Sequence, residues 1–193
     1  MDNGDACNTS QWLLSNHIGT HIDFPRHFSA KGKILDNYPA DFWIFHKAAL
    51  IDLSPVTPGQ LISWQDFNIN NISSDIEILL VKTGFSNIRN QNIFWQENPG
   101  FHPDIANQLR ESLPNVRVLG FDSISVSSYT NREIGRMAHK AFLETANPIL
   151  LLEDMDLSEI NYKTRFHQML VAPMRVTGAD ASPCTVLAEV EKE

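Results

Sequence analysis

The sequence predicts a single α/β domain in which at least some strands pair in parallel. The first observation is size and composition, because 193 residues with 42% hydrophobic and 20% charged residues suit one globular domain. The second is the order of the segments, since short apolar runs alternate with helix-like segments along the chain. Strands that alternate with helices are typical of α/β domains. We therefore expect one domain over residues 1–193, without an internal repeat or a linker.

The first third of the chain predicts few regular elements. Residues 1–10 are polar, and residues 12–14 (Trp-Leu-Leu) begin an extended segment. Residues 29–33 have the composition of a surface turn, and the apolar residues 48–53 predict a short buried strand. Residues 57–60 (Thr-Pro-Gly-Gln) predict the start of a helix. Thr suits the N-cap, Pro suits the first helical position, and Gln can reach back as in a capping box.

The rest of the chain predicts a more regular pattern. Residues 85–101 hold Trp95, several amides and a Pro-Gly pair, which indicates a long functional or lid-like loop. Thr130 and Glu133 have the spacing of a second capping box. The expected helices are 103–113 and 130 to about 146, and the expected strands are 76–81, 116–122, 149–153 and 185–190.

Charge, hydropathy and cysteine content indicate the class of protein and which partners it lacks. The formal net charge of −8 argues against nucleic acid and anionic membranes as partners. No apolar run approaches the ~18 residues of a membrane span, and the amino-terminal residues are acidic where a signal peptide would be basic. Cys7 and Cys184 form no C-x-x-C pattern and are expected to be free thiols. We expect a cytoplasmic protein.

Residues 17–27 (His-Ile-Gly-Thr-His-Ile-Asp-Phe-Pro-Arg-His) contain three of the seven histidines and one carboxylate. If the segment is extended, side chains alternate between faces, so His17, Gly19, His21 and Asp23 share one face; an extended or sharply turning segment is favoured over a helix. Pro25 would soon break a helix through this stretch. Two imidazoles and a carboxylate on one face, with Gly19 leaving space between them, predict a metal site.

The donor atoms indicate the kind of metal. Imidazole nitrogen and carboxylate oxygen suit Zn²⁺ or Mn²⁺, and no cysteine is near enough in sequence for a purely structural thiolate site. The alternative is that these histidines are ordinary strand residues with local hydrogen bonds. The other histidines, His46, His102 and His167, are expected to have surface or hydrogen-bonding roles.

The same stretch matches the pattern H-x-G-T-H-x-D-x-P-x-H at every fixed position. It resembles the signature of the cyclase family, which includes bacterial kynurenine formamidases and isatin hydrolases. Other segments agree in order: Val81-Lys82-Thr83-Gly84, Asn98-Pro99-Gly100, Leu119-Gly120-Phe121-Asp122 and Gly178-Ala179-Asp180-Ala181-Ser182-Pro183. The resemblance implies a mixed sheet or barrel-like β core flanked by helices, of the cyclase-like swivelling β/α type. It also implies that an amino-terminal strand of the family, with part of the substrate pocket, is missing.

The resemblance also implies the remaining ligands. His17, His21, Asp23 and Glu153 would bind a first metal, while Asp23, Glu153 and His139 would bind a second, so that the two carboxylates bridge. A carboxylate can bridge because it has two oxygens, whereas a neutral imidazole offers one lone pair.

This chain departs from the family pattern at three places. The spacing between His139 and Glu153 differs slightly, which we attribute to an insertion around Asn147-Pro148. Asp154 stands where the family often has Asn, and Ser127 stands where an Asp commonly follows Ser-Val.

His27 is implied to be the catalytic residue. An imidazole that binds no metal titrates near neutrality, so it can take a proton from the attacking water and return it to the leaving nitrogen. The alternative, that His27 is a third or fourth ligand, stays open.

The resemblance implies a metal-dependent hydrolase of a small amide, similar to kynurenine formamidase, which converts N-formylkynurenine to kynurenine and formate. One or two Zn²⁺ per subunit are expected, with Mn²⁺ possible, and the family implies a homo-oligomer, either a dimer or a tetramer. Two alternatives remain: hydrolysis of a cyclic amide or lactone, as in isatin hydrolases, and a metal-binding homologue without catalysis.

Overall fold

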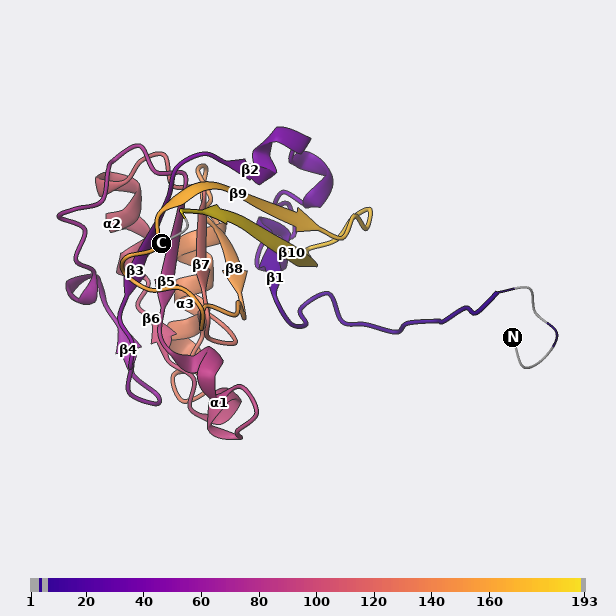
Figure 1. Ribbon diagram of the computed structural model, residues 1–193, viewed down its shortest axis with the longest axis horizontal. Helices are drawn as coiled ribbons and strands as arrows, with labels where there is room; N and C mark the ends of the chain where they lie inside the picture. Colours follow the sequence, from indigo (N-terminus) through magenta and orange to yellow (C-terminus); the bar gives the residue numbers. More distant parts are fainter. Residues whose placement is uncertain (1–3, 5–6, 192–193) are drawn as a thin grey trace.

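Eight strands form one continuous mixed sheet in the computed structural model, which describes residue 4 and residues 7–191 (Figure 1). The strand order is β2-β9-β10-β1-β8-β7-β5-β3, and a separate pair is formed by β4 and β6. The strands are β1 (His21–Asp23), β2 (Ile44–Phe45), β3 (Ala48–Asp52), β4 (Leu61–Ile62), β5 (Ile78–Lys82), β6 (Gly100–Phe101), β7 (Val118–Phe121), β8 (Leu150–Glu153), β9 (Phe166–Pro173) and β10 (Ala181–Val190).

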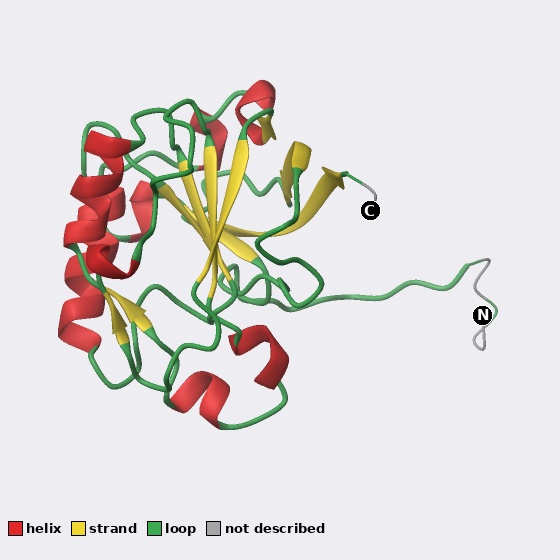
Figure 2. Ribbon diagram, turned by 60° about the vertical axis from the view of Figure 1, so that its left-hand side comes forward, coloured by secondary structure: helices red, strands yellow, loops and turns green. Residues whose placement is uncertain are grey.

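The helices are few and short. The α-helices are α1 (Ile93–Gln96), α2 (Asp104–Ser112) and α3 (Arg132–Leu143), and the 3-10 helices are η1 (Pro25–His27), η2 (Leu35–Asn37), η3 (Ala40–Trp43), η4 (Trp64–Asp66) and η5 (Phe85–Ile88). Figure 2 shows the longer helices gathered on one side of the sheet. Within the described residues, no helix has the length and apolar content to cross a membrane.

Strands β3, β5, β7 and β8 form the parallel half of the sheet. Every residue of β5, β7 and β8 is buried, which explains why these strands are almost continuously apolar in sequence. The predicted strands at 48–53, 76–81, 116–122 and 149–153 and the predicted helix at 103–113 are confirmed, with small shifts at their ends. Parallel pairing is confirmed as well.

Strand β1 joins this parallel half to an antiparallel half. It pairs antiparallel with β8 on one side and with β10 on the other, and β10 pairs with β9 as a long hairpin. The sheet curls so that β9 approaches β3, which gives the expected barrel-like core. Strand β10 is longer than the predicted strand 185–190, and β9 lies outside the predicted strands. The three residues of β1 therefore sit in the middle of the sheet.

The predicted helix beginning at Thr57 is wrong. The Gln60 side chain does accept a hydrogen bond from the Thr57 N–H, as a capping box requires. However, Gly59 has a φ of +71°, which ends the turn, and the chain continues into strand β4. The local capping signal was real, but pairing of β4 with β6 determined the fold of the segment.

Two other predictions need correction. Helix α3 has Asn131 rather than Thr130 as its N-cap, and no side chain caps it. The Thr130 hydroxyl instead lies 2.9 Å from the Ser128 hydroxyl. The loop expected at 85–101 contains η5, α1 and β6, so it is more structured than predicted.

Candidate metal centre

Strand β1 supplies two of the expected ligands directly. His21 and Asp23 are buried on one face of the strand, while Ile22 points to the opposite face and is fully buried in the core. Alternation along a strand explains this arrangement. His17 arrives differently, because residues 16–20 bend and Gly19 has a φ of +60°. The structure thus brings His17, His21 and Asp23 together as the sequence predicted, and the sharply turning form describes how His17 reaches the other two.

The Asp23 carboxylate faces three imidazoles, and the Glu153 carboxylate faces two of the same three. Asp23 Oδ1 lies 2.9 Å from His17 Nδ1 and 3.5 Å from His21 Nε2, whereas Asp23 Oδ2 lies 3.7 Å from His139 Nε2. Glu153 Oε2 lies 3.5 Å from His21 Nε2, whereas Glu153 Oε1 lies 3.7 Å from His139 Nε2. Each carboxylate therefore has one oxygen toward the His21 side and the other toward the His139 side. This is the geometry that bridging carboxylates require.

Backbone carbonyls orient the two buried imidazoles. His21 Nδ1 lies 2.8 Å from the Gly19 carbonyl oxygen, and His139 Nδ1 lies 3.0 Å from the Gly135 carbonyl oxygen. A carbonyl can only accept, so Nδ1 carries the hydrogen in each ring and Nε2 keeps its lone pair. Ser127 Oγ is also 3.0 Å from His139 Nδ1. Both free lone pairs face the carboxylates.

Asp23 gives the strongest indication that a cation fits here. Both of its carboxylate oxygens are buried, yet neither accepts a hydrogen bond of acceptable geometry. A buried ionised carboxylate without such partners is costly, and a bound cation would compensate it. The donor set around it consists of imidazole nitrogen and carboxylate oxygen, which suits a divalent transition metal such as Zn²⁺ or Mn²⁺. The residues present fit a metal.

Burial and neighbouring charges shift the pKa values of the candidate ligands from their ordinary values. Burial raises the pKa of Glu153 well above its ordinary value, and the charge of Asp23 raises it further. Burial lowers the pKa of His139 to about 4 and also lowers that of His21. Burial acts in the same direction on His17, but the carboxylates of Asp23 and Asp180 outweigh it, so the pKa of His17 is above its ordinary value. His21 and His139 are therefore neutral and able to donate a lone pair at neutral pH. A cation would favour loss of the proton from Glu153.

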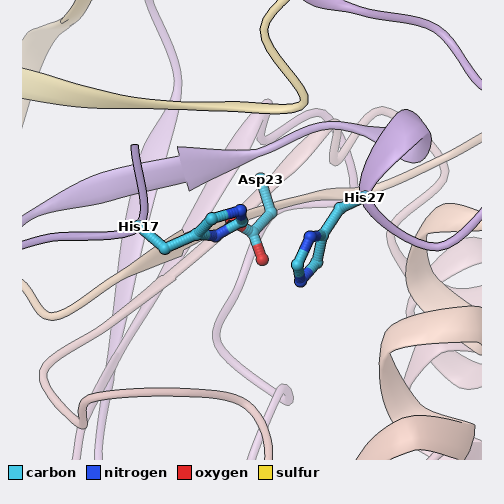
Figure 3. Close-up of side chains that lie close together, drawn as sticks. All are labelled: His17, Asp23 and His27. Carbon is cyan, nitrogen blue, oxygen red and sulfur yellow. The ribbon is translucent and has the colours of Figure 1, made fainter. Parts of the chain in front are cut away.

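His27 lies beside this cluster rather than away from it. Its ring centroid is 4.1 Å from that of His17, and donor atoms of His17, Asp23 and His27 lie within 4.8 Å of one another. Figure 3 shows the three side chains directed toward one another, His27 coming from the turn after β1. The second group with this spacing is His21, Asp23 and Glu153. The geometry is compatible with His27 as a proton carrier or as a ligand.

Asp180 is a residue of this site that the sequence analysis missed. Its Oδ2 lies 3.2 Å from His27 Nδ1 and 3.3 Å from His17 Nε2, and its Oδ1 accepts a hydrogen bond from Asn16 Nδ2 at 2.5 Å. Burial raises the pKa of Asp180, but the hydrogen bonds from His17, His27 and Asn16 outweigh it, so the pKa is below its ordinary value. The only signal in the sequence was its place in the segment 178–183, which has a counterpart in the family.

The other histidines have the roles expected from the sequence. His46 Nδ1 lies 3.4 Å from Gln168 Nε2, His102 pairs with Asp104 at 2.6 Å, and His167 is exposed.

Comparison with known proteins identifies relatives of the whole chain. The family model Cyclase matches residues 4–128. The chain is 28% identical to the kynurenine formamidase of Bacillus cereus over 178 residues, which covers 92% of this chain and 78% of that protein. A solved structure described as a potential metal-dependent hydrolase with cyclase activity superposes with a TM-score of 0.73 at 24% identity, covering 94% of this chain and 82% of the other. Isatin hydrolase A from Labrenzia aggregata, bound to benzyl benzoate, superposes with a TM-score of 0.75 at 21% identity, covering 91% of this chain and 74% of the other.

Proposed function

Because this chain belongs to the cyclase family, we propose that it is a metal-dependent hydrolase of a small amide, of the arylformamidase kind, with N-formylkynurenine as its first candidate substrate. The observation that carries the proposal is the buried pair Asp23 and Glu153, whose four oxygens face three imidazoles. Kynurenine formamidase is the name of several relatives over more than nine-tenths of this chain.

We assign the ligand roles as follows. His17 and His21 would hold one cation, His139 would hold a second, and Asp23 and Glu153 would be shared between the two. When bound, a divalent cation such as Zn²⁺ or Mn²⁺ polarises the substrate carbonyl and lowers the pKa of water. The carbonyl contacts of His21 and His139 fix the lone pairs that bind it.

His27 is the proposed proton carrier. It is partly exposed, so substrate and water can reach it, while the carboxylates and the imidazoles of His21 and His139 are buried. A positioned imidazole takes the proton of the attacking water as the carbon–oxygen bond forms. It then delivers that proton to the leaving nitrogen as the carbon–nitrogen bond breaks. For N-formylkynurenine the products are formate and the free aniline of kynurenine.

A second candidate is hydrolysis of a cyclic amide or lactone. Its support is the structural similarity to isatin hydrolase A, over 91% of this chain. The same proton transfer would open a ring instead of releasing formate. The two candidates differ in the walls of the substrate pocket and not in the metal ligands.

We also propose that the protein is a homo-oligomer, a dimer or a tetramer. Trp12 and Leu13 are 77% and 100% exposed on the extended segment that leaves the body of the protein (Figure 1). Leu170 and Leu187, which pair across β9 and β10, are also exposed. Exposed apolar groups of this kind are typical of subunit contacts. Light scattering that gave the mass of a monomer would contradict this proposal.

The function is tested by turnover of N-formylkynurenine with metal-free protein and with protein reconstituted with Zn²⁺ or Mn²⁺. Metal-dependent release of kynurenine supports the first candidate. Metal binding without that release, together with ring opening of isatin or a lactone, supports the second. Protein that binds metal and hydrolyses neither class would be a metal-binding homologue without catalysis, and the proposal would be wrong.

A further inference from the structure

Asp180 lies immediately before strand β10, and β10 is paired with β1 in the sheet. Its side chain faces the candidate metal centre. Its carbonyl oxygen accepts a hydrogen bond from the Phe24 N–H at 2.9 Å, so its backbone is anchored to the residue after Asp23. Its side chain is held from the other side by Asn16, which donates to Oδ1. The remaining oxygen, Oδ2, is directed at His17 and His27.

One oxygen thus faces two imidazole nitrogens. Oδ2 lies 3.2 Å from His27 Nδ1 and 3.3 Å from His17 Nε2. An ionised carboxylate only accepts hydrogen bonds, so both of these nitrogens must carry hydrogen to bond to it. In neutral His27, and in His17 when a cation is bound, the opposite nitrogens then supply the lone pairs. These are Nε2 of His27 and Nδ1 of His17.

Both lone pairs are those that the proposed reaction needs. His17 Nδ1 is the atom 2.9 Å from Asp23 Oδ1, where a shared cation would bind. His27 Nε2 is the atom left free to accept a proton. A metal-bound imidazole commonly donates its second N–H to a carboxylate, and the orientation of a catalytic imidazole by a carboxylate follows the same principle.

We propose that Asp180 is a positioning residue that sets the tautomers of His17 and His27 at once, so that one imidazole can bind metal and the other can accept a proton. This inference rests on the proposed function, and it deepens the description of the same site. It does not make Asp180 a metal ligand, because Asn16 and the two imidazoles already engage both of its oxygens.

The first test is nuclear magnetic resonance of the imidazole nitrogens in metal-free protein, at a pH above the range in which imidazoles titrate. In the unmodified protein we expect hydrogen on Nδ1 of His27. His27 is the reporter in metal-free protein, because His17 Nδ1 lies 2.9 Å from Asp23 Oδ1, closer than His17 Nε2 lies to Asp180. In Asp180→Ala we expect His27 to lose this fixed assignment. Unchanged tautomers in Asp180→Ala would overturn the inference, and this readout does not depend on activity.

A matched control is Asp36→Ala. Asp36 accepts a hydrogen bond from the Gly178 N–H at 2.8 Å, so it holds the same turn as Asp180 without contacting either imidazole. Tautomers are expected to be unchanged in this variant. If Asp36→Ala altered them as much as Asp180→Ala, the turn and not the Asp180 carboxylate would be responsible.

The second test is catalysis at saturating metal and with a substrate that the unmodified protein hydrolyses. Asp180→Ala should lower kcat by roughly 10²–10⁴-fold with little change in KM, because the loss of the fixed His27 tautomer impairs proton transfer and not substrate binding. Metal affinity should fall by about 10–100-fold. Complete loss of metal with unchanged tautomers would make Asp180 a ligand and overturn the inference. If the unmodified protein hydrolyses none of the substrates, the proposed function fails, while the resonance measurement still tests Asp180.

Discussion

His21 and Glu153 stand directly opposite each other on the antiparallel strands β1 and β8, and His21 Nε2 lies 3.5 Å from Glu153 Oε2. Opposite residues of an antiparallel pair project their side chains to the same face. The register therefore brings together residues separated by more than one hundred positions in the sequence. A change of one residue in register would turn either side chain to the other face.

Glu153→Gln tests this relationship. The amide keeps the size of the side chain but loses its charge and one acceptor oxygen, so it cannot bridge. We expect metal affinity to fall by more than about 100-fold, since loss of an outer partner alone costs about 10–100-fold. Metal binding is measured by titration with a competing chelator. Glu189→Gln, at an exposed position of β10, is the control and should bind metal normally; equal affinities in the two variants would contradict the ligand role of Glu153.

His27→Ala distinguishes a proton carrier from a ligand. If His27 carries the proton, the variant should keep its metal while kcat falls by roughly 10²–10⁴-fold. Metal content per subunit and turnover are measured on the same preparation. The exposed His167→Ala is the control and should behave as the unmodified protein. Loss of one metal in His27→Ala would assign His27 to the ligands, and unchanged turnover would exclude it from catalysis.

The buried His139 should make the metal-free protein less stable in mild acid. Its pKa is lowered to about 4 by burial, below the value of about 6.5 in an unfolded chain. The unfolded state therefore takes up a proton first as the pH falls. The contribution of neutral His139 to the free energy of unfolding is fully present above about pH 6.5. As the pH falls from about 7 to about 5, protonation of this residue in the unfolded state should lower the free energy of unfolding by about 2 kcal/mol. The burial-lowered pKa of His21 acts in the same direction.

Chemical denaturation at the two pH values checks this expectation. His139→Gln removes the titrating group and should reduce the difference in unfolding free energy by about 2 kcal/mol. His167→Gln, at an exposed position, should leave the difference as it is. An unchanged pH dependence in His139→Gln would show that His139 does not titrate as described.

Gly135 lets helix α3 approach the segment that holds Ser127. A Cβ at this position would lie 2.2 Å from Ser127 Oγ and 2.4 Å from Ser127 Cβ. Ala is better than Gly in a helix by about 1 kcal/mol, but overpacking costs about 1–3 kcal/mol. We expect Gly135→Ala to destabilise the fold by up to about 2 kcal/mol and to weaken metal binding, because the Gly135 carbonyl orients His139.

Thermal unfolding and metal titration measure these two effects. Arg136→Ala changes the next, exposed residue of the same helix and serves as the control, with a small expected change. Greater stability of Gly135→Ala would mean that Ser127 moves away without cost, and the close approach would then be unimportant.

Some features of this protein are determined by short stretches of sequence. The apolar runs of β5 and β7 and the amphipathic pattern of α2 predicted these elements because periodicity within a short window reports which faces are buried. The alternation of His21, Ile22 and Asp23 likewise predicted two ligands on one face and a core residue on the other. His139 and Glu153 were predicted from resemblance to a family, and their proximity to Asp23 needed the structure.

Other features were decided only by tertiary structure. The residues at Thr57 have the local signals of a helix, but pairing of β4 with β6 made them a turn. The role of Asp180 could not be predicted from its segment, because it depends on β10 lying beside β1 and on the bend that brings His17 to the same place. The sequence by itself determined the α/β class, the family signature and the types of the candidate ligands, which are properties of neighbouring residues. The register of the sheet decided which distant carboxylates meet those histidines, because contacts across more than one hundred residues depend on how all the strands pair.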